Sequence, residues 1–166
     1  ISFAAEMPSL CVLVFSKDRP GQLFQLLRSL RRCCGEVTVH VIVLYKASSA
    51  NIQTQYQSLR AEDVELVEES DFCEDLKAIL KRVESTYILL AVDDLVFVAD
   101  LHVPRLLQAL TKDASLLGVQ PRLNPSIVYR QTSESACATP HLEYHADSGL
   151  YAFSWRSEKA EFHYPF

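Results

Sequence analysis

The sequence predicts an α/β fold, in which a mainly parallel sheet is flanked by helices on both sides. Four apolar segments rich in β-branched residues, at 10–15, 37–45, 64–67 and 86–92, are typical of strands buried within a sheet. Between these segments, apolar residues recur at helical spacing. Strands that alternate with helices form βαβ units, and such units build a Rossmann-like parallel sheet.

The helices are predicted from the residues at their ends and from their apolar spacing. Pro20 suits the first turn of a helix that follows the first strand and ends at Gly35. Asp71 and Glu74 have the spacing of a capping box, so a second helix is expected to begin there. The remaining expected elements are a polar helix over 48–59, a helix that begins near 100 and includes 104–110, and a strand over 115–120.

We expect one domain over residues 1–166, with its core in 10–124. At 166 residues, of which 49% are hydrophobic, the chain is long enough to bury one sizeable core. Residues 125–166 are polar and turn-rich, with strands expected at 127–129 and 150–155. We interpret the aromatic cluster at 162–166 as part of a structure that is truncated at its carboxyl-terminal end.

Composition and charge exclude two classes of partner. A net charge of −5, with acids spread along the chain, argues against a general electrostatic grip on nucleic acid. No apolar run approaches the roughly 20 residues that a membrane span needs. The chain begins at Ile1 rather than Met, so the compartment stays open: cytoplasmic, or lumenal if a targeting segment was removed.

The five cysteines form no C-x-x-C motif, and their number is odd. Buried or idle thiols are therefore the favoured interpretation. A disulfide from Cys33 or Cys34 to a distant cysteine stays open as an alternative.

An acid pair lies within the most apolar part of the chain. The segment "YILLAVDDLVFV" carries Asp93 and Asp94 among ten apolar or aromatic residues. Burying an ionised carboxylate without a partner costs several kcal/mol or more. The pair follows the fourth predicted strand, and the polar residues 16–19 follow the first. Because ligands bind beyond the carboxyl ends of parallel strands, both segments are expected at a ligand site.

Paired carboxylates at such a site indicate a divalent metal. Adjacent strand residues point to opposite faces, so both acids can meet one ligand only where the strand turns into a loop. Otherwise one acid binds the metal, and its neighbour either binds a sugar hydroxyl or lies behind the metal ligands without touching the metal. Oxygen ligands favour Mg²⁺ or Mn²⁺. An alternative stays open, in which one Asp caps the following turn and the other is solvated.

The segments "VFSKDRPGQLFQLLRSL" and "YILLAVDDLVF" together resemble family-2-like glycosyltransferases of the GT-A fold, the fold of nucleotide-diphospho-sugar transferases. The resemblance covers residues 10–124. Phe97 follows Asp94 by three residues, which matches Asp94 to the last, metal-binding acid of the family's Asp-x-Asp motif. Asp93 matches the middle position, and Val92 replaces the first acid, so this chain departs from the standard metal and ribose site.

The resemblance implies transfer of a sugar from a nucleotide-diphosphate donor to an acceptor hydroxyl, with help from Mn²⁺ or Mg²⁺. It implies that residues 125–166 belong to the acceptor side. The implied metal ligands are Asp94 and Asp93, and the implied nucleotide-binding residues are Ser16, Lys17, Asp18, Arg19, Glu69 and Asp93. An ordinary strand-to-helix turn with a capping Asp is the alternative for residues 16–19, and helix capping is the simpler role for Asp71.

No catalytic residue is assigned. In the family, a carboxylate base that activates the acceptor lies downstream of the metal motif. Asp147, Glu158 and Glu161 are candidates, but a surface acid is the simpler interpretation of each. The resemblance also makes His163 a candidate metal ligand, as a late His is in some GT-A enzymes, but a histidine of the aromatic cluster is the simpler interpretation. No partner spacing makes His141 and His145 a zinc site.

Three competing interpretations remain. A degenerate GT-A domain would bind a nucleotide or a protein without catalysis, which the replacement of the first acid by Val92 favours. A receiver-like or phosphohydrolase-like domain would carry its acid pair after the first strand, where this chain has the single acid Asp18. An interaction module would use the aromatic residues of 151–166 as its contact surface.

Overall fold

The computed structural model of the chain describes residues 9–34, 39–121, 125–126, 128–130, 134–136 and 140–154. The chain divides into two compact units, Ile1–Leu107 and Gln108–Phe166, which are described separately. The division falls inside a helix, whereas the core predicted from sequence extends to residue 124. The single-domain assignment stays a prediction.

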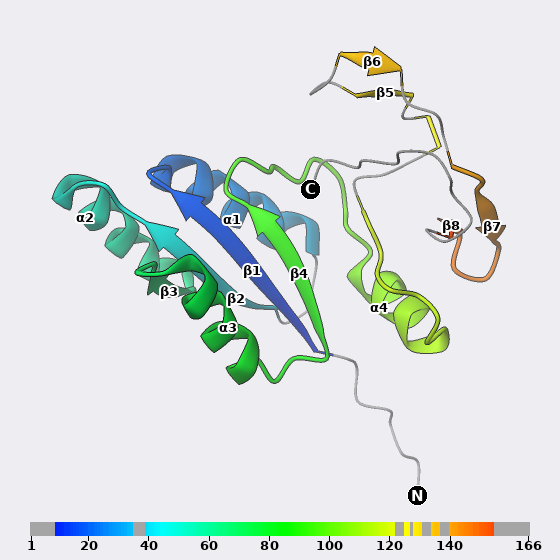
Figure 1. Ribbon diagram of the computed structural model, residues 1–166, viewed down its shortest axis with the longest axis horizontal. Helices are drawn as coiled ribbons and strands as arrows, with labels where there is room; N and C mark the ends of the chain where they lie inside the picture. Colours follow the sequence, from blue (N-terminus) through cyan, green and yellow to red (C-terminus); the bar gives the residue numbers. More distant parts are fainter. Residues whose placement is uncertain are drawn as a thin grey trace, which may run out of the picture. The chain divides into compact units, whose positions relative to one another are not determined.

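The first unit contains a four-stranded parallel sheet, as predicted (Figure 1). Its spatial order is β3-β2-β1-β4, so the chain builds the sheet outward in one direction and then adds β4 on the other side of β1. In register, Leu10 lies opposite both Val39 and Tyr87. The strands are β1 (Leu10–Lys17), β2 (Val39–Lys46), β3 (Glu65–Glu68) and β4 (Tyr87–Val92).

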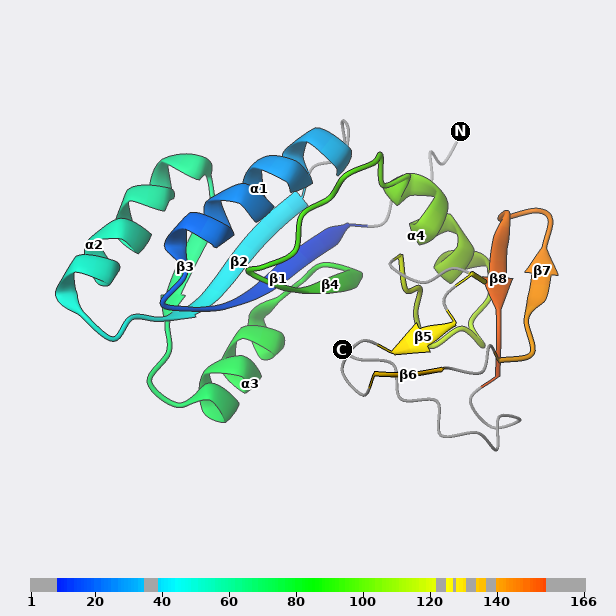
Figure 2. The ribbon, with the colours of Figure 1, turned by 90° about the horizontal axis from the view of Figure 1, so that it is seen from above.

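Helices cover both faces of this sheet, which confirms the layered α/β fold. Figures 1 and 2 show α1 and α2 on one face and α3 on the other. The segment after β4 runs along α1, where the amide of Leu101 donates to the carbonyl of Cys33. The helices are α1 (Pro20–Cys34), α2 (Ala50–Ser58), the 3₁₀ turn η1 (Leu59–Glu62), α3 (Phe72–Arg82) and α4 (Val103–Lys112).

The alternation of side chains along β1 divides the core into two clusters. Val12 and Val14 pack with apolar residues of α1 and α2, among them Leu23 and Tyr56. Cys11 and Leu13 face the other way and pack with Ile79 of α3 in the smaller cluster. Because β1 is covered on both faces, its sequence is a continuous apolar run rather than an alternating one.

Helix starts follow the predicted chemistry. Pro20 is the first residue of α1, where its missing N–H costs nothing. The Asp71 side chain accepts a hydrogen bond from the amide of Glu74, as expected for the N-cap of α3. None of the described helices has the length and apolarity to cross a membrane.

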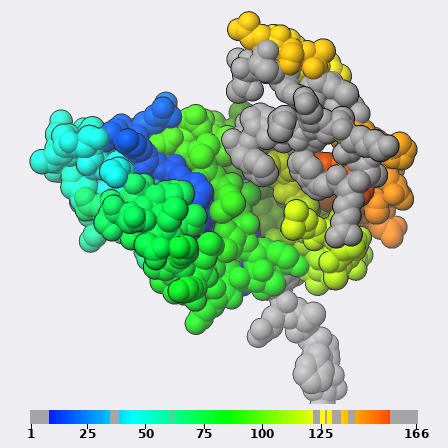
Figure 3. All heavy atoms as spheres, viewed as in Figure 1, coloured from blue at the N-terminus to red at the C-terminus, as the bar shows by residue number. Residues whose placement is uncertain are grey.

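One part of the sheet surface is left open on the α3 side. The atoms of β4 reach the surface beside α3 in Figure 3. Ile88, Leu90 and Val92 are exposed there, Leu90 by 61%. The opposite face of β4 is covered, because Ala91 lies buried in the cluster shared with α1.

The described cysteines are free thiols. Cys11, Cys33 and Cys34 are buried, whereas Cys73 is exposed. Burial raises the pKa of Cys34 to about 11, so this thiol stays protonated and unreactive at neutral pH. Cys137 lies outside the described residues.

The second unit contains two antiparallel pairs, β5 (Tyr129–Arg130) with β6 (Ser135–Ala136), and β7 (Glu143–His145) with β8 (Leu150–Ala152). Gly149 adopts a positive φ of 63° in the turn before β8. The strands predicted at 127–129 and 150–155 are thus only partly matched, by β5 and β8, and residue 127 lies outside the described chain.

The strand predicted at 115–120 is wrong. The Asp113 carboxylate accepts hydrogen bonds from both the amide and the hydroxyl of Ser115, so the chain turns where the strand was expected to start. Leu117 is 93% exposed, because none of the sheets among the described residues covers this segment. An apolar run as short as Leu116-Leu117 does not separate a strand from an exposed loop.

Candidate functional site

The carboxyl ends of the four parallel strands bring the predicted site residues to one edge of the sheet. Residues 16–19 span the end of β1 and the loop after it. Likewise 46–49 begin at the last residue of β2, 68–71 begin at the last residue of β3, and 93–94 follow β4. The strand order reverses between β1 and β4, and these two strands carry the two segments singled out by sequence. Such a reversal is where open α/β sheets bind ligands.

Asp93 is buried in a hydrogen-bonded network rather than in apolar surroundings. Its Oδ2 accepts from the Ser16 hydroxyl at 2.8 Å, and the Ser16 and Tyr56 hydroxyls are 2.6 Å apart. Because Ser16 gives its hydrogen to the carboxylate, Tyr56 must donate to Ser16. The Tyr56 hydroxyl in turn accepts from the Arg19 amide at 3.0 Å. Every member of this chain of hydrogen bonds is therefore satisfied.

Arg19 supplies the positive charge opposite both acids. Its Nη1 lies 3.6 Å from Asp93 Oδ1 and 3.9 Å from Asp94 Oδ2. The chain leaves β4 in a turn at Asp93 and Asp94, so both side chains reach one partner, as a regular strand would not allow. The side chain of Asp93 is 6% exposed and that of Asp94 is 55% exposed.

Asp18 ties the loop after β1 to the start of α2. It adopts a left-handed φ of 57°, which Asp tolerates better than most residues. Its carboxylate accepts from the Ser48 amide at 2.6 Å and from the Ser48 hydroxyl at 2.7 Å. These bonds, that from the hydroxyl first, lower the pKa of Asp18 below its usual value. The alternative that Asp18 caps its own helix α1 is not what the structure contains.

Two lysines lie side by side at the same edge. Lys17 and Lys46 are register partners on β1 and β2. Lys46 Nζ pairs with Glu69 Oε1 at 3.1 Å, and the Glu69 amide donates to the carbonyl of Tyr45. Lys17 is exposed and forms no ion pair with the part of the chain that the structure describes. The edge thus offers positive charge to an anionic ligand beside the acid pair.

Sequence reasoning missed Tyr56 and Ser48. Tyr56 lies in a helix predicted as polar, and its ring stacks on Tyr45 with centroids 4.4 Å apart. Burial raises the pKa of the Tyr56 hydroxyl, which therefore keeps its proton at neutral pH. An aromatic residue four positions after Ile52 indicates a buried face of a helix, but nothing in the spacing reveals the role of its hydroxyl.

The residues at this edge fit a divalent cation through one carboxylate. Both oxygens of Asp93 already have partners, in Ser16 and Arg19. Asp94 is half exposed, and its carboxylate forms a long ion pair with Arg19. In the described chain no group of three or more His, Cys, Asp or Glu side chains could hold a metal ion. Mg²⁺ commonly takes one or two carboxylates and completes its shell with water and substrate phosphates.

None of the remaining candidates belongs to the described residues of the first unit. Asp147, His141 and His145 belong to the second unit and are exposed. Glu158, Glu161 and His163 lie outside the described residues, as do Trp155 and the aromatic segment at 162–166.

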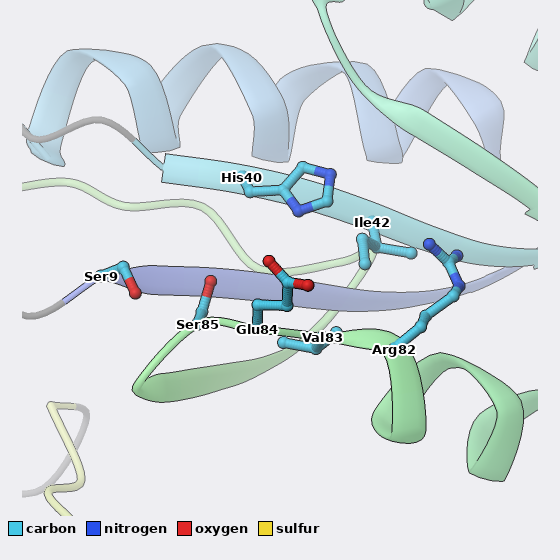
Figure 4. A pocket seen from close by; sticks show the side chains of 7 residues that line it. All are labelled: Ser9, His40, Ile42, Arg82, Val83, Glu84 and Ser85. Carbon is cyan, nitrogen blue, oxygen red and sulfur yellow. The ribbon is translucent and has the colours of Figure 1, made fainter.

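A hollow also lies at the opposite, amino-terminal end of the strands (Figure 4). It has a volume of about 440 Å³ and is lined by His40 and Arg82, among others. Arg82 forms a two-pronged ion pair with Glu65, and His40 Nε2 lies 3.5 Å from the same carboxylate. Arg82 and His40 are therefore both directed at Glu65, and we assign the hollow no ligand.

We expect Glu65→Gln to lower the free energy of unfolding by up to about 1 kcal/mol at neutral pH, as for a partly exposed bidentate pair. The hydrogen bond from Arg82 lowers the pKa of Glu65 from its usual 4.5, so the pair stabilises the fold above that pH. The stabilisation is lost as pH falls through the lowered pKa.

Urea unfolding at a series of pH values measures this effect. The difference between wild type and Glu65→Gln should be largest above pH 5 and shrink steadily in more acidic solution. Glu84→Gln, which changes a side chain lining the same hollow, is the matched control and should differ little from wild type throughout. A difference independent of pH contradicts the assignment to Glu65.

Comparison of the sequence with protein-family models and with curated proteins gives no match.

Proposed function

We propose that the chain binds a nucleotide-diphosphate sugar at the carboxyl edge of its sheet and transfers the sugar to an acceptor hydroxyl. The observation that carries the proposal is the contact of Arg19 with both Asp93 and Asp94. This contact joins the loop after β1 to the turn after β4, and both segments are those that resemble family-2-like glycosyltransferases of the GT-A fold.

In this proposal each residue at the edge has a separate task. Arg19 and Lys17 bind the diphosphate, because guanidinium and ammonium groups are the usual partners of phosphate oxygens. Asp18 and Glu69 offer carboxylate oxygens to the ribose and the base. Ser16 and Asp93 hold the loop in place through their mutual hydrogen bond. That Asp93 also binds the metal or the nucleotide stays a prediction.

Asp94 is the proposed ligand of Mn²⁺ or Mg²⁺, because its carboxylate is the more accessible of the two. When bound, the cation would neutralise charge that develops on the departing diphosphate. The catalytic base stays unassigned; Asp147, Glu158 and Glu161 remain candidates.

A second candidate function is nucleotide binding without transfer. Val92 stands where the resemblance has the first acid, and Asp93 is committed to Ser16 and Arg19. One carboxylate is then left for a cation, which favours a domain that binds a nucleotide but has lost catalysis.

Calorimetric titration of the chain with nucleoside diphosphates tests the proposed function. We expect one of UDP, GDP, CDP or ADP to bind, and to bind more tightly when Mn²⁺ is present. Release of free sugar from the matching nucleotide sugar would then separate an enzyme from a nucleotide-binding domain. Absence of binding by all four diphosphates, with and without Mn²⁺, contradicts the proposal.

A further inference from the structure

A single guanidinium group faces both acids of the pair. Arg19 Nη1 lies 3.6 Å from Asp93 and 3.9 Å from Asp94. The guanidinium places a positive charge between the two carboxylates. It lies where a divalent cation bound to Asp94 would experience strong repulsion.

The two contacts of Arg19 differ in how firmly the acid is held. Asp93 is buried, and it also accepts a hydrogen bond from Ser16 at 2.8 Å. The Asp94 side chain is 55% exposed, and its contact with Arg19 is the longer one. The contact with Asp94 can therefore open while the hydrogen bond from Ser16 to Asp93 stays intact.

The backbone of Arg19 is held independently of its side chain. Its amide donates to the Tyr56 hydroxyl at 3.0 Å, and its carbonyl accepts from the Leu23 amide at 3.0 Å. The side chain is 55% exposed. The guanidinium can thus turn toward a ligand without any change in the course of the loop.

We propose that Arg19 is an internal counter-ion that keeps divalent cations from Asp94 until a nucleoside diphosphate draws the guanidinium away. This inference rests on the proposed function. A diphosphate is a bidentate partner for arginine, and its binding would free the Asp94 carboxylate for Mn²⁺ or Mg²⁺. Nucleotide and cation therefore bind with positive coupling, each raising the affinity for the other.

Mn²⁺ binding to the full chain without nucleotide tests the inference. The electron paramagnetic resonance signal of free Mn²⁺ gives the affinity directly and requires no activity. We expect Arg19→Gln to bind Mn²⁺ about three- to tenfold more tightly than wild type, because the competing charge is gone. Arg19→Lys keeps the charge and should bind Mn²⁺ with nearly the affinity of wild type.

Arg28→Gln is the matched control, because it removes the same charge from an exposed position of α1. Its Mn²⁺ affinity should change by less than about twofold, since solvent and salt screen the charge. Urea midpoints close to that of wild type confirm that the variants are folded. An Arg19→Gln variant that binds Mn²⁺ no more tightly than Arg28→Gln overturns the inference.

Coupling provides the second measurement. Saturating UDP, or whichever diphosphate binds, should raise the Mn²⁺ affinity of wild type, and this increase should be smaller in Arg19→Gln. If wild type binds no nucleoside diphosphate, the proposed function fails, whereas the comparison of Mn²⁺ affinities without nucleotide still decides whether Arg19 excludes the cation.

Discussion

Asp93→Ala should lower the free energy of unfolding by about 2–3 kcal/mol. The substitution removes the acceptor for the Ser16 hydroxyl, which is itself buried, and disturbs the chain of hydrogen bonds to Tyr56. A buried hydroxyl that loses its partner keeps the cost of its desolvation and gains nothing in return. Urea unfolding at pH 7 of the full chain measures the loss as a lower midpoint.

Asp94→Ala is the control for this measurement. It removes the neighbouring carboxylate, which is half exposed and forms a long ion pair, so the expected loss is below about 1 kcal/mol. Equal losses in the two variants would mean that the network around Asp93 does not hold the loop. The amide oxygen of Asp93→Asn can still accept a hydrogen bond from Ser16. A smaller loss of unfolding free energy in this variant than in Asp93→Ala would further support the role of that hydrogen bond.

Asp94→Asn should weaken the Mn²⁺-dependent part of nucleoside diphosphate binding by about 10- to 100-fold, the range for loss of one charged ligand. No other described carboxylate joins Asp94 and Asp93 in a cluster that could replace the missing ligand. Binding without Mn²⁺ should change little or improve, because Arg19 loses one of its two anionic partners. Calorimetry with and without Mn²⁺ measures both quantities.

Asp100→Asn removes the same charge from an exposed position of the segment that follows β4, and serves as the control for charge alone. Its Mn²⁺-dependent binding should match that of wild type. Metal-dependent binding that survives in Asp94→Asn removes Asp94 from the proposed cation site.

The sheet and its main helices could be predicted because their signals are local and agree with one another. The apolar run of β1 indicates a strand covered on both faces, and α1 begins at the proline that suits a first turn. The strand predicted at 115–120 is wrong because its local signal was too weak. Its short apolar run carried no information about whether a sheet would cover it.

The position of the candidate site could be predicted, but not its internal contacts. Parallel strands place their carboxyl ends at one edge, which was enough to expect residues 16–19 beside Asp93 and Asp94. The contact of Arg19 with both acids depends on the turn after β4, and the role of Ser48 depends on the left-handed backbone of Asp18. Such conformations arise from the assembled structure and leave no periodic signal in the sequence.

Because β4 pairs with β1 in the sheet order β3-β2-β1-β4, some contacts of the site join residues that are far apart in the sequence. Ser16 and Tyr56 are 40 residues apart, whereas Ser16 and Asp93 are 77 residues apart. Closing the longer loop costs more chain entropy, and contacts distant in sequence slow folding. During synthesis, α1, β2 and α2 leave the ribosome before Asp93 and Asp94 do. Arg19 therefore lacks both of its carboxylate partners until β4 has joined the sheet.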